Sequence, residues 1–172
     1  MTVSRHPSVL LDKVFTLIGE KTNKEKAPLV QKFARILFKN ISPADLQGRS
    51  DSDLYGATLS LWQRFSHYDS AQPFINVFNP KITKHGWQSE HTIVELIIKD
   101  MPFLVDSVRI ALNRLGITAH LLLHSPIAIS RDAEHHLNNV NADLISGSDN
   151  SAKETVFLIE IDHQETSEQI AY

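Results

Sequence analysis

Several features that mark common functional classes are missing from this sequence of 172 residues. It contains no cysteine, which excludes a disulfide framework and any zinc or iron–sulfur site held by cysteine. Its six glycines stand at least eight residues apart, so neither the G-x-G-x-x-G dinucleotide fingerprint nor a P-loop can be written. No apolar run approaches the roughly 20 residues that cross a bilayer. We therefore expect a soluble, cytoplasmic protein with no cofactor site in this part of the chain.

The charges are mixed along the chain, with 17 basic and 20 acidic residues and a net charge of −3. With charges so balanced, the sequence predicts no strongly basic surface of the kind that a nucleic-acid-binding protein needs. One basic stretch runs from Lys21 to Lys39 on a helical pattern, and a solvated helix face explains it better than a phosphate-binding patch. Neither nucleic acid nor a membrane is an expected partner.

The first part of the chain, residues 1–70, is predicted to be a helical segment. Ser50 and Asp53 have the spacing of a capping box, which predicts a helix start at that point. The apolar residues that follow recur at steps of three and four. They are Leu54, Ala57, Leu61, Phe65 and Tyr68.

The second part, residues 71–172, shows the period of strands. Strand-like runs cover residues 74–78, 91–98, 117–129 and 156–161, and a helical stripe from Leu104 to Leu115 ends at Gly116. Residues 131–153 are polar and predict a long flexible hairpin connection. In the third strand one face is expected to carry Ile117, Ala119, Leu121, Leu123, Ile127 and Ile129.

The predicted fold class is therefore α+β, with a helical segment before a ferredoxin-like unit. The order strand, helix, strand, strand is the first three quarters of a βαββαβ unit. Residues 167–170 could begin the next helix, but the closing helix and strand are missing. Either the unit is truncated, leaving an open edge that invites pairing with another domain, or the strand at 74–78 fills that edge.

The strand–helix junction is the candidate ligand site. Backbone N–H groups of a helix's first turn favour an anion or carboxylate, and Asp100 and Asp106 could meet an ammonium group. The alternative is that Asp100 only caps the helix, Pro102 starts it, and Phe103 and Leu104 pack in the core. The candidate residues are Asp100, Met101, Pro102, Phe103, Leu104 and Asp106.

Other chemistry is less well supported. His120 and His124 share a strand face but stand about 13 Å apart, too far to hold one ion. His135 and His136 lie near acidic residues in the polar loop, where a solvated loop is a better interpretation than a metal site. No serine sits in a glycine-flanked nucleophile elbow. We expect no metal and no catalytic residue.

The same junction carries a family resemblance. Residues 100–108, DMPFLVDSV, resemble the D-x-PFLVDS segment of the large NAD-specific glutamate dehydrogenases of bacteria. Further blocks agree in order and spacing from about residue 10 to the end of the chain. They are Asp53–Gly56, Leu61-Trp62, Val77–Pro80, Gly86-Trp87, His91–Glu95 and Ser125–Asp132.

This resemblance implies an ACT-like unit that precedes the catalytic part of an enzyme converting L-glutamate and NAD to 2-oxoglutarate, ammonium and NADH. The implied role is regulatory or assembly-related, with the remaining domains of that enzyme as partners; a homo-oligomer and an amino-acid effector are further options. The alternative is an amino-acid-sensing module. ACT domains that bind amino acids commonly have glycine in the first strand–helix loop, where this chain has Phe103, whose ring could fill the pocket.

Overall fold

The computed structural model describes residues 7–69, 71–141 and 152–165. The predicted helix start at 167–170 lies outside these residues, as does the middle of the 131–153 connection. The helices are α1 (Pro7–Lys21), α2 (Ala27–Leu37), a 3₁₀ turn (Ala44–Leu46), α3 (Asp51–Ser66), α4 (Ile82–His85) and α5 (Leu104–Arg114). The strands are β1 (Phe74–Phe78), β2 (Thr92–Lys99), β3 (Ala119–Arg131), β4 (Leu137–Asn141) and β5 (Ala152–Ile161).

The five strands form one antiparallel sheet in the order β1-β2-β5-β3-β4. Its centre is the predicted unit, in which α5 connects β2 to β3 and β5 inserts between them. β1 pairs with the outer edge of β2 over all five of its residues. Of the two alternatives, the structure therefore shows the second: the strand at 74–78 fills the vacant position, and both edges of β2 are paired. The α+β class and the ACT-like arrangement are confirmed.

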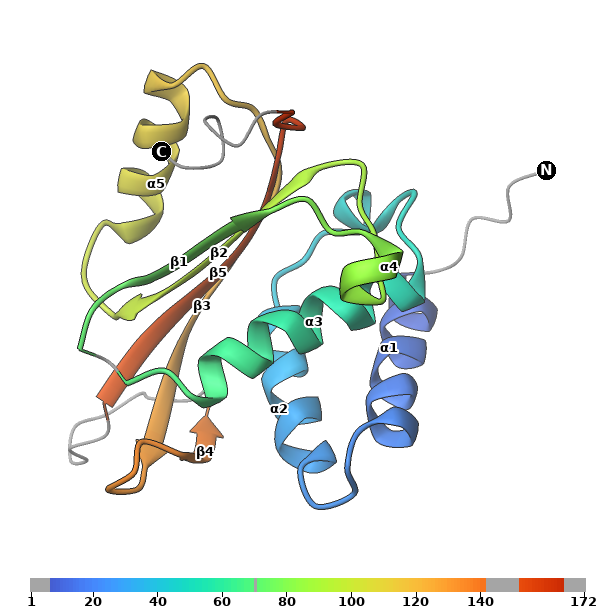
Figure 1. Cartoon of the computed structure of the whole chain (residues 1–172), viewed down its shortest axis with the longest axis vertical. Helices are drawn as coiled ribbons and strands as arrows, with labels where there is room; N and C mark the ends of the chain where they lie inside the picture. Colours follow the sequence, from blue (N-terminus) through green and yellow to red (C-terminus); the bar gives the residue numbers. More distant parts are fainter. Residues whose placement is uncertain (1–6, 70, 142–151, 166–172) are drawn as a thin grey trace.

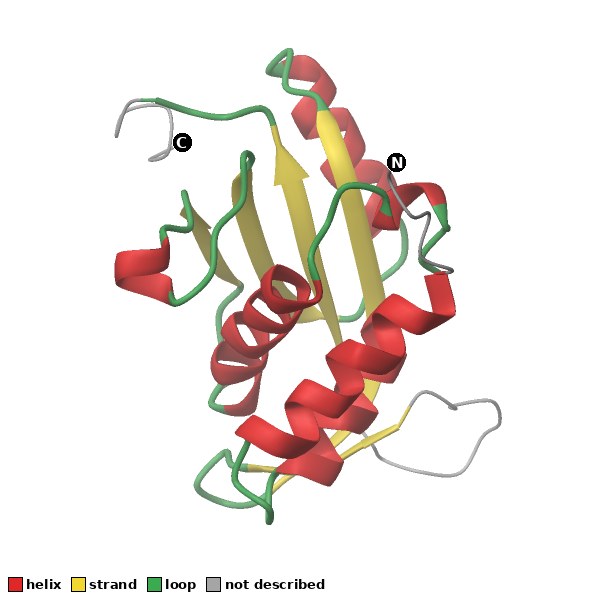
Figure 2. Cartoon of the chain, turned by 90° about the vertical axis from the view of Figure 1, so that its right-hand side faces the viewer, coloured by secondary structure: helices red, strands yellow, loops and turns green. Residues whose placement is uncertain are grey.

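Helices cover the two faces of the sheet unequally. α2 and α3 lie on one side of the sheet with α1 packed against them, and α5 lies against the other face (Figure 1). Figure 2 looks onto the layer of helices with the strands behind it. A large core on the α1–α3 side joins residues from both predicted parts of the chain, whereas Phe157, Ile159 and Ile161 centre a smaller core beneath α5. The division at residues 70 and 71 stays a prediction.

Local sequence signals fix the helix ends. The hydroxyl of Ser50 accepts the backbone N–H of Asp53, as the capping box predicts, and the stripe that follows in α3 is buried. Gly116 has a φ of 67°, while the N–H groups of Gly116 and Ile117 bond to Asn113 and Leu112. That pair of bonds is a Schellman motif, which glycine allows because it has no Cβ. Within the described residues no helix combines the length and apolarity needed to span a bilayer.

Two strand predictions were wrong. The polar connection contains β4, whose Val140 is buried opposite Ile129. Ile117 packs in the smaller core with α5, and Ala119 is exposed, because the register with β5 shifts between Ala119 and Leu121. The apolar face of β3 therefore starts at Leu121.

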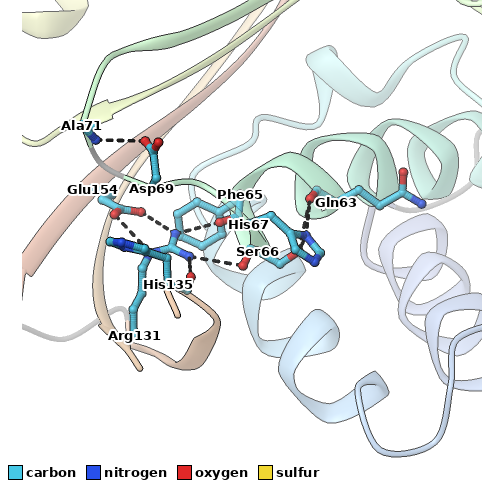
Figure 3. A network of polar contacts seen from close by, with 9 residues as sticks. All are labelled: Gln63, Phe65, Ser66, His67, Asp69, Ala71, Arg131, His135 and Glu154. Atoms are coloured by element: carbon cyan, nitrogen blue, oxygen red, sulfur yellow. Dashed lines mark hydrogen bonds and ion pairs between the residues drawn. The ribbon is translucent and has the colours of Figure 1, made fainter. Parts of the chain in front are cut away.

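A buried ion pair joins the sheet to the end of α3 (Figure 3). The Arg131 guanidinium bonds to both carboxylate oxygens of Glu154, at 3.3 and 2.8 Å, and the two side chains are 8% and 1% exposed. It also donates to the carbonyl oxygens of Phe65 at 2.7 Å, Ser66 at 3.2 Å and His135 at 3.0 Å. The last carbonyl groups of a helix have no partner within it, so the bonds from Arg131 cap the end of α3. The same guanidinium neutralises the charge of Glu154.

Gly56 allows α3 to approach the β1–β2 connection. A Cβ added there would lie 2.6 Å from Cδ1 of Trp87 and closer still to its Cβ and Cγ. We expect Gly56→Ala to lower the free energy of unfolding by about 1–3 kcal/mol through overpacking, despite the roughly 1 kcal/mol that alanine adds to helix propensity. Urea unfolding followed by tryptophan fluorescence measures this loss.

Gly19→Ala is the matched control, because the added Cβ would approach only the flexible end of Gln31, at 3.0 Å. We expect it to be neutral or stabilising. If both variants unfold at the same urea concentration, the close approach of Trp87 to α3 is not a constraint.

Candidate functional site

The candidate junction between β2 and α5 is held by β5. The N–H of Asp100 donates to the carbonyl oxygen of Lys153 at 2.9 Å, and an oxygen of its carboxylate accepts the Thr155 hydroxyl at 2.6 Å. Helix α5 begins only at Leu104, and no side chain caps it. The prediction that Asp100 caps the helix was therefore wrong, because its carboxylate is hydrogen-bonded to Thr155 of β5 and not to the helix.

Phe103 occupies the N-cap position of α5 in a left-handed conformation, with φ 64° and ψ 15°. This region costs an L-residue roughly 1–2 kcal/mol, and it is where the family resemblance expects a glycine. The side chain is also 78% exposed. The prediction that Phe103 packs in the core was wrong, while Leu104 does pack against the smaller core. That the Phe103 ring obstructs a ligand at this loop stays a prediction.

A cavity of about 240 Å³ lies at the junction. Of the predicted residues, all but Pro102 line it; they are Asp100, Met101, Phe103, Leu104 and Asp106. Sequence reasoning missed His124, Pro126 and Thr155, which β3 and β5 bring to the same cavity and which no local pattern marks. The cavity brings two carboxylates beside the first turn of a helix, but it is smaller than the roughly 300–1,000 Å³ of most ligand sites. Effector binding at this loop stays a prediction.

Four large apolar side chains are exposed on α5 and at its two ends, among exposed charged and polar residues of the same helix. Beside Phe103, the side chains of Met101, Ile110 and Leu115 are 48%, 51% and 63% exposed. No described residue of α5 is fully buried. We call these four residues the α5 surface.

The histidines form local contacts. Nε2 of His120 lies 2.7 Å from Asp162, and the His91 ring stacks on the His120 ring at 4.2 Å. The backbone N–H of Thr118, with the His120 ring, holds the pKa of Asp162 below its usual value. These contacts explain the His91–His120 pair without a metal ion.

One histidine group has metal-like spacing. Ligand atoms of Asp132, Glu134 and His136 lie within 4.8 Å of one another. The Asp132 carboxylate, however, already accepts the backbone N–H groups of Glu134 and His136 at 3.0 and 2.8 Å. Such bonds are those of a turn closed by an aspartate, and they account for the grouping.

Comparison with known proteins gives a consistent family. A family model described as "Glutamate dehydrogenase, ACT1 domain" matches residues 33–172. The chain is 39% identical over 153 residues to the NAD-specific glutamate dehydrogenase of Halomonas elongata, and 40% identical over 147 residues to that of Pseudomonas aeruginosa. These alignments cover 89% and 86% of this chain but only 9% of either relative. No solved structure matches significantly. The chain belongs to the glutamate dehydrogenase ACT1 domain family.

Proposed function

We propose that this chain is a non-catalytic regulatory and assembly domain of a cytoplasmic NAD-dependent glutamate dehydrogenase. The relatives' names and the small share of their length that the chain spans support this role. The parent reaction would convert L-glutamate, NAD and water to 2-oxoglutarate, ammonium and NADH. NAD and the catalytic residues would then belong to other parts of the polypeptide, and those parts are the partners of this domain.

The observation that carries the assembly role is the state of Phe103. Its backbone is strained and its ring is 78% exposed, so it carries two local costs that a glycine would remove. Backbone strain of this kind clusters at functional sites, and an exposed aromatic ring is a common anchor of protein interfaces. The α5 surface is therefore the proposed contact with the rest of the enzyme.

The test compares two variants in the full-length enzyme and in the isolated 172-residue chain. We expect Phe103→Gly to leave the isolated chain as stable or more stable, because the left-handed strain is relieved. In the full-length enzyme, Phe103→Gly and Leu115→Glu should each weaken domain contact by about 2 kcal/mol or more, the size of an interface hot spot. Size-exclusion chromatography with light scattering, and thermal inactivation of glutamate-dependent NAD reduction, measure this loss.

Val9→Glu is the control, because Val9 is an apolar side chain on α1, 44% exposed and away from α5. Full-length enzyme carrying Phe103→Gly or Leu115→Glu that assembles and inactivates like Val9→Glu would contradict the assembly role.

A further inference from the structure

A second and larger cavity lies on the helical side of the sheet. Its volume is about 580 Å³, within the usual range of small-molecule sites. Four separate segments of the chain form it: residues 47–57 around the start of α3, residues 87–91 before β2, position 121 of β3, and positions 158 and 160 of β5. It shares no lining residue with the cavity at the β2–α5 junction.

Part of its wall is apolar and firmly held. Leu54, Leu121 and Leu158 line the cavity and belong to the large core, and each is no more than 5% exposed. Trp87 lines it as well, fixed against α3 at the site of Gly56. A ligand would meet preformed hydrophobic and aromatic surface, so little ordering would oppose binding.

The polar part of the wall holds more acidic than basic side chains, beside two amides, a hydroxyl and the imidazole of His91. One guanidinium, that of Arg49, lines the cavity with three carboxylates, those of Asp53, Glu90 and Glu160. Arg49 is occupied, because it bonds to both carboxylate oxygens of Glu160 and to the carbonyl oxygen of Asp45. Its charge is therefore balanced, and the negative charges of Asp53 and Glu90 remain.

Those two carboxylates can receive further donors. Each oxygen of Asp53 accepts one bond, from the N–H of Gln88 at 3.2 Å and from the Ser50 hydroxyl at 2.6 Å, and a carboxylate oxygen has room for a second. Glu90 is exposed and has no hydrogen bond or ion pair within the part of the chain that the structure describes. The cavity thus offers negatively charged hydrogen-bond acceptors, which favour a positively charged donor.

We propose that this cavity binds a small organic cation, with an ammonium or guanidinium group against Asp53 and Glu90 and an apolar body against Trp87 and the leucines. Hydrogen bonds from a charged donor to a carboxylate are about twice as strong as neutral ones, and an indole adds attraction for a cation. A dicarboxylate such as glutarate would be repelled by the carboxylates of Asp53 and Glu90, so we expect it not to bind in this cavity. This inference does not rest on the dehydrogenase role.

The test uses two probes of equal carbon number and opposite charge. Calorimetric titration of the 172-residue chain with 1,5-diaminopentane should give saturable binding, whereas glutarate should give none. Glu90→Gln removes a charge from an exposed side chain without disturbing the fold, and we expect it to weaken diaminopentane binding roughly tenfold. Asp53→Asn should weaken it at least as much.

Asp51→Asn is the matched control, because Asp51 lies in the same first turn of α3 but does not line the cavity. It should leave the affinity unchanged. No binding of diaminopentane, equal binding of glutarate, or an affinity unmoved by Glu90→Gln and Asp53→Asn would each overturn the proposal.

Discussion

Replacing Arg131 by leucine should lower the free energy of unfolding by about 3–5 kcal/mol, the loss found when one member of a buried ion pair is removed. The Glu154 carboxylate is 1% exposed, so water cannot replace the guanidinium that now neutralises it. The carbonyl oxygens of Phe65, Ser66 and His135 would lose a donor at the same time. Urea unfolding followed by circular dichroism measures the loss.

Two controls separate the ion pair from a general effect of losing an arginine. Arg109 is exposed on α5, and Arg109→Leu should change stability by no more than about 0.5 kcal/mol. Arg131→Leu combined with Glu154→Leu should recover part of the loss, because no buried charge remains. An Arg131→Leu variant as stable as Arg109→Leu would show that the pair is hydrated in solution.

The Tyr68 phenol gives an independent measure of the same network. Burial raises the pKa of Tyr68, the charge of Glu154 raises it further, and the positive charge of Arg131 lowers it. In the Arg131→Leu variant the pKa of Tyr68 should therefore rise, since the positive charge of Arg131 that lowers it is gone. Spectrophotometric titration of the phenols detects the shift.

Phe33→Ala is the second substitution that we expect to reduce stability strongly. It should lower the free energy of unfolding by about 3–5 kcal/mol. Phe33 is fully buried, and its ring lies 5.3 Å from that of Trp62 and 5.2 Å from that of Phe65. The substitution leaves a cavity between α2 and α3 and removes both ring contacts. Chemical unfolding monitored by tryptophan fluorescence measures the loss.

Phe103→Ala is the control, because it makes the same chemical change on a side chain that is 78% exposed. We expect it to change the free energy of unfolding by close to zero. Phe33→Leu should fall between the two, because leucine fills part of the space. Equal losses for Phe33→Ala and Phe103→Ala would contradict the packing of α2 against α3.

Features fixed by neighbouring residues could be predicted from the sequence. The Ser50–Asp53 cap and the Gly116 helix end depend on contacts within a few residues, so their spacing is visible. The strand at 74–78 was also predictable, since two prolines bound its apolar run. Its place beside β2 was one of two alternatives, the other being an open sheet edge, and only the observed pairing of β1 with β2 decides between them.

Features fixed by distant residues could not be predicted. β4 has little apolar character, and its pairing with β3 alone makes it a strand. Asp100 has the spacing of a cap, yet Thr155, 55 positions later, takes its carboxylate. Nothing in a bulky aromatic residue signals the left-handed backbone of Phe103.

The larger cavity illustrates the same limit for function. Its lining comes from segments that are separated by tens of residues, and no short motif connects Asp53, Glu90 and Glu160. By contrast, the β2–α5 junction could be found because it is one continuous segment, although its contacts differ from those predicted.

The pairing of β1 with β2 also decides how this sheet can be extended. A ferredoxin-like unit normally receives its last strand from the polypeptide that follows, beside the first strand of the unit. Here the segment that precedes the unit already holds that place through five register pairs. Any strand offered by another part of an enzyme or by a second subunit must either displace β1 or add outside β1 or β4. The order of segments along the chain thus restricts how a neighbour can join this sheet by backbone hydrogen bonds.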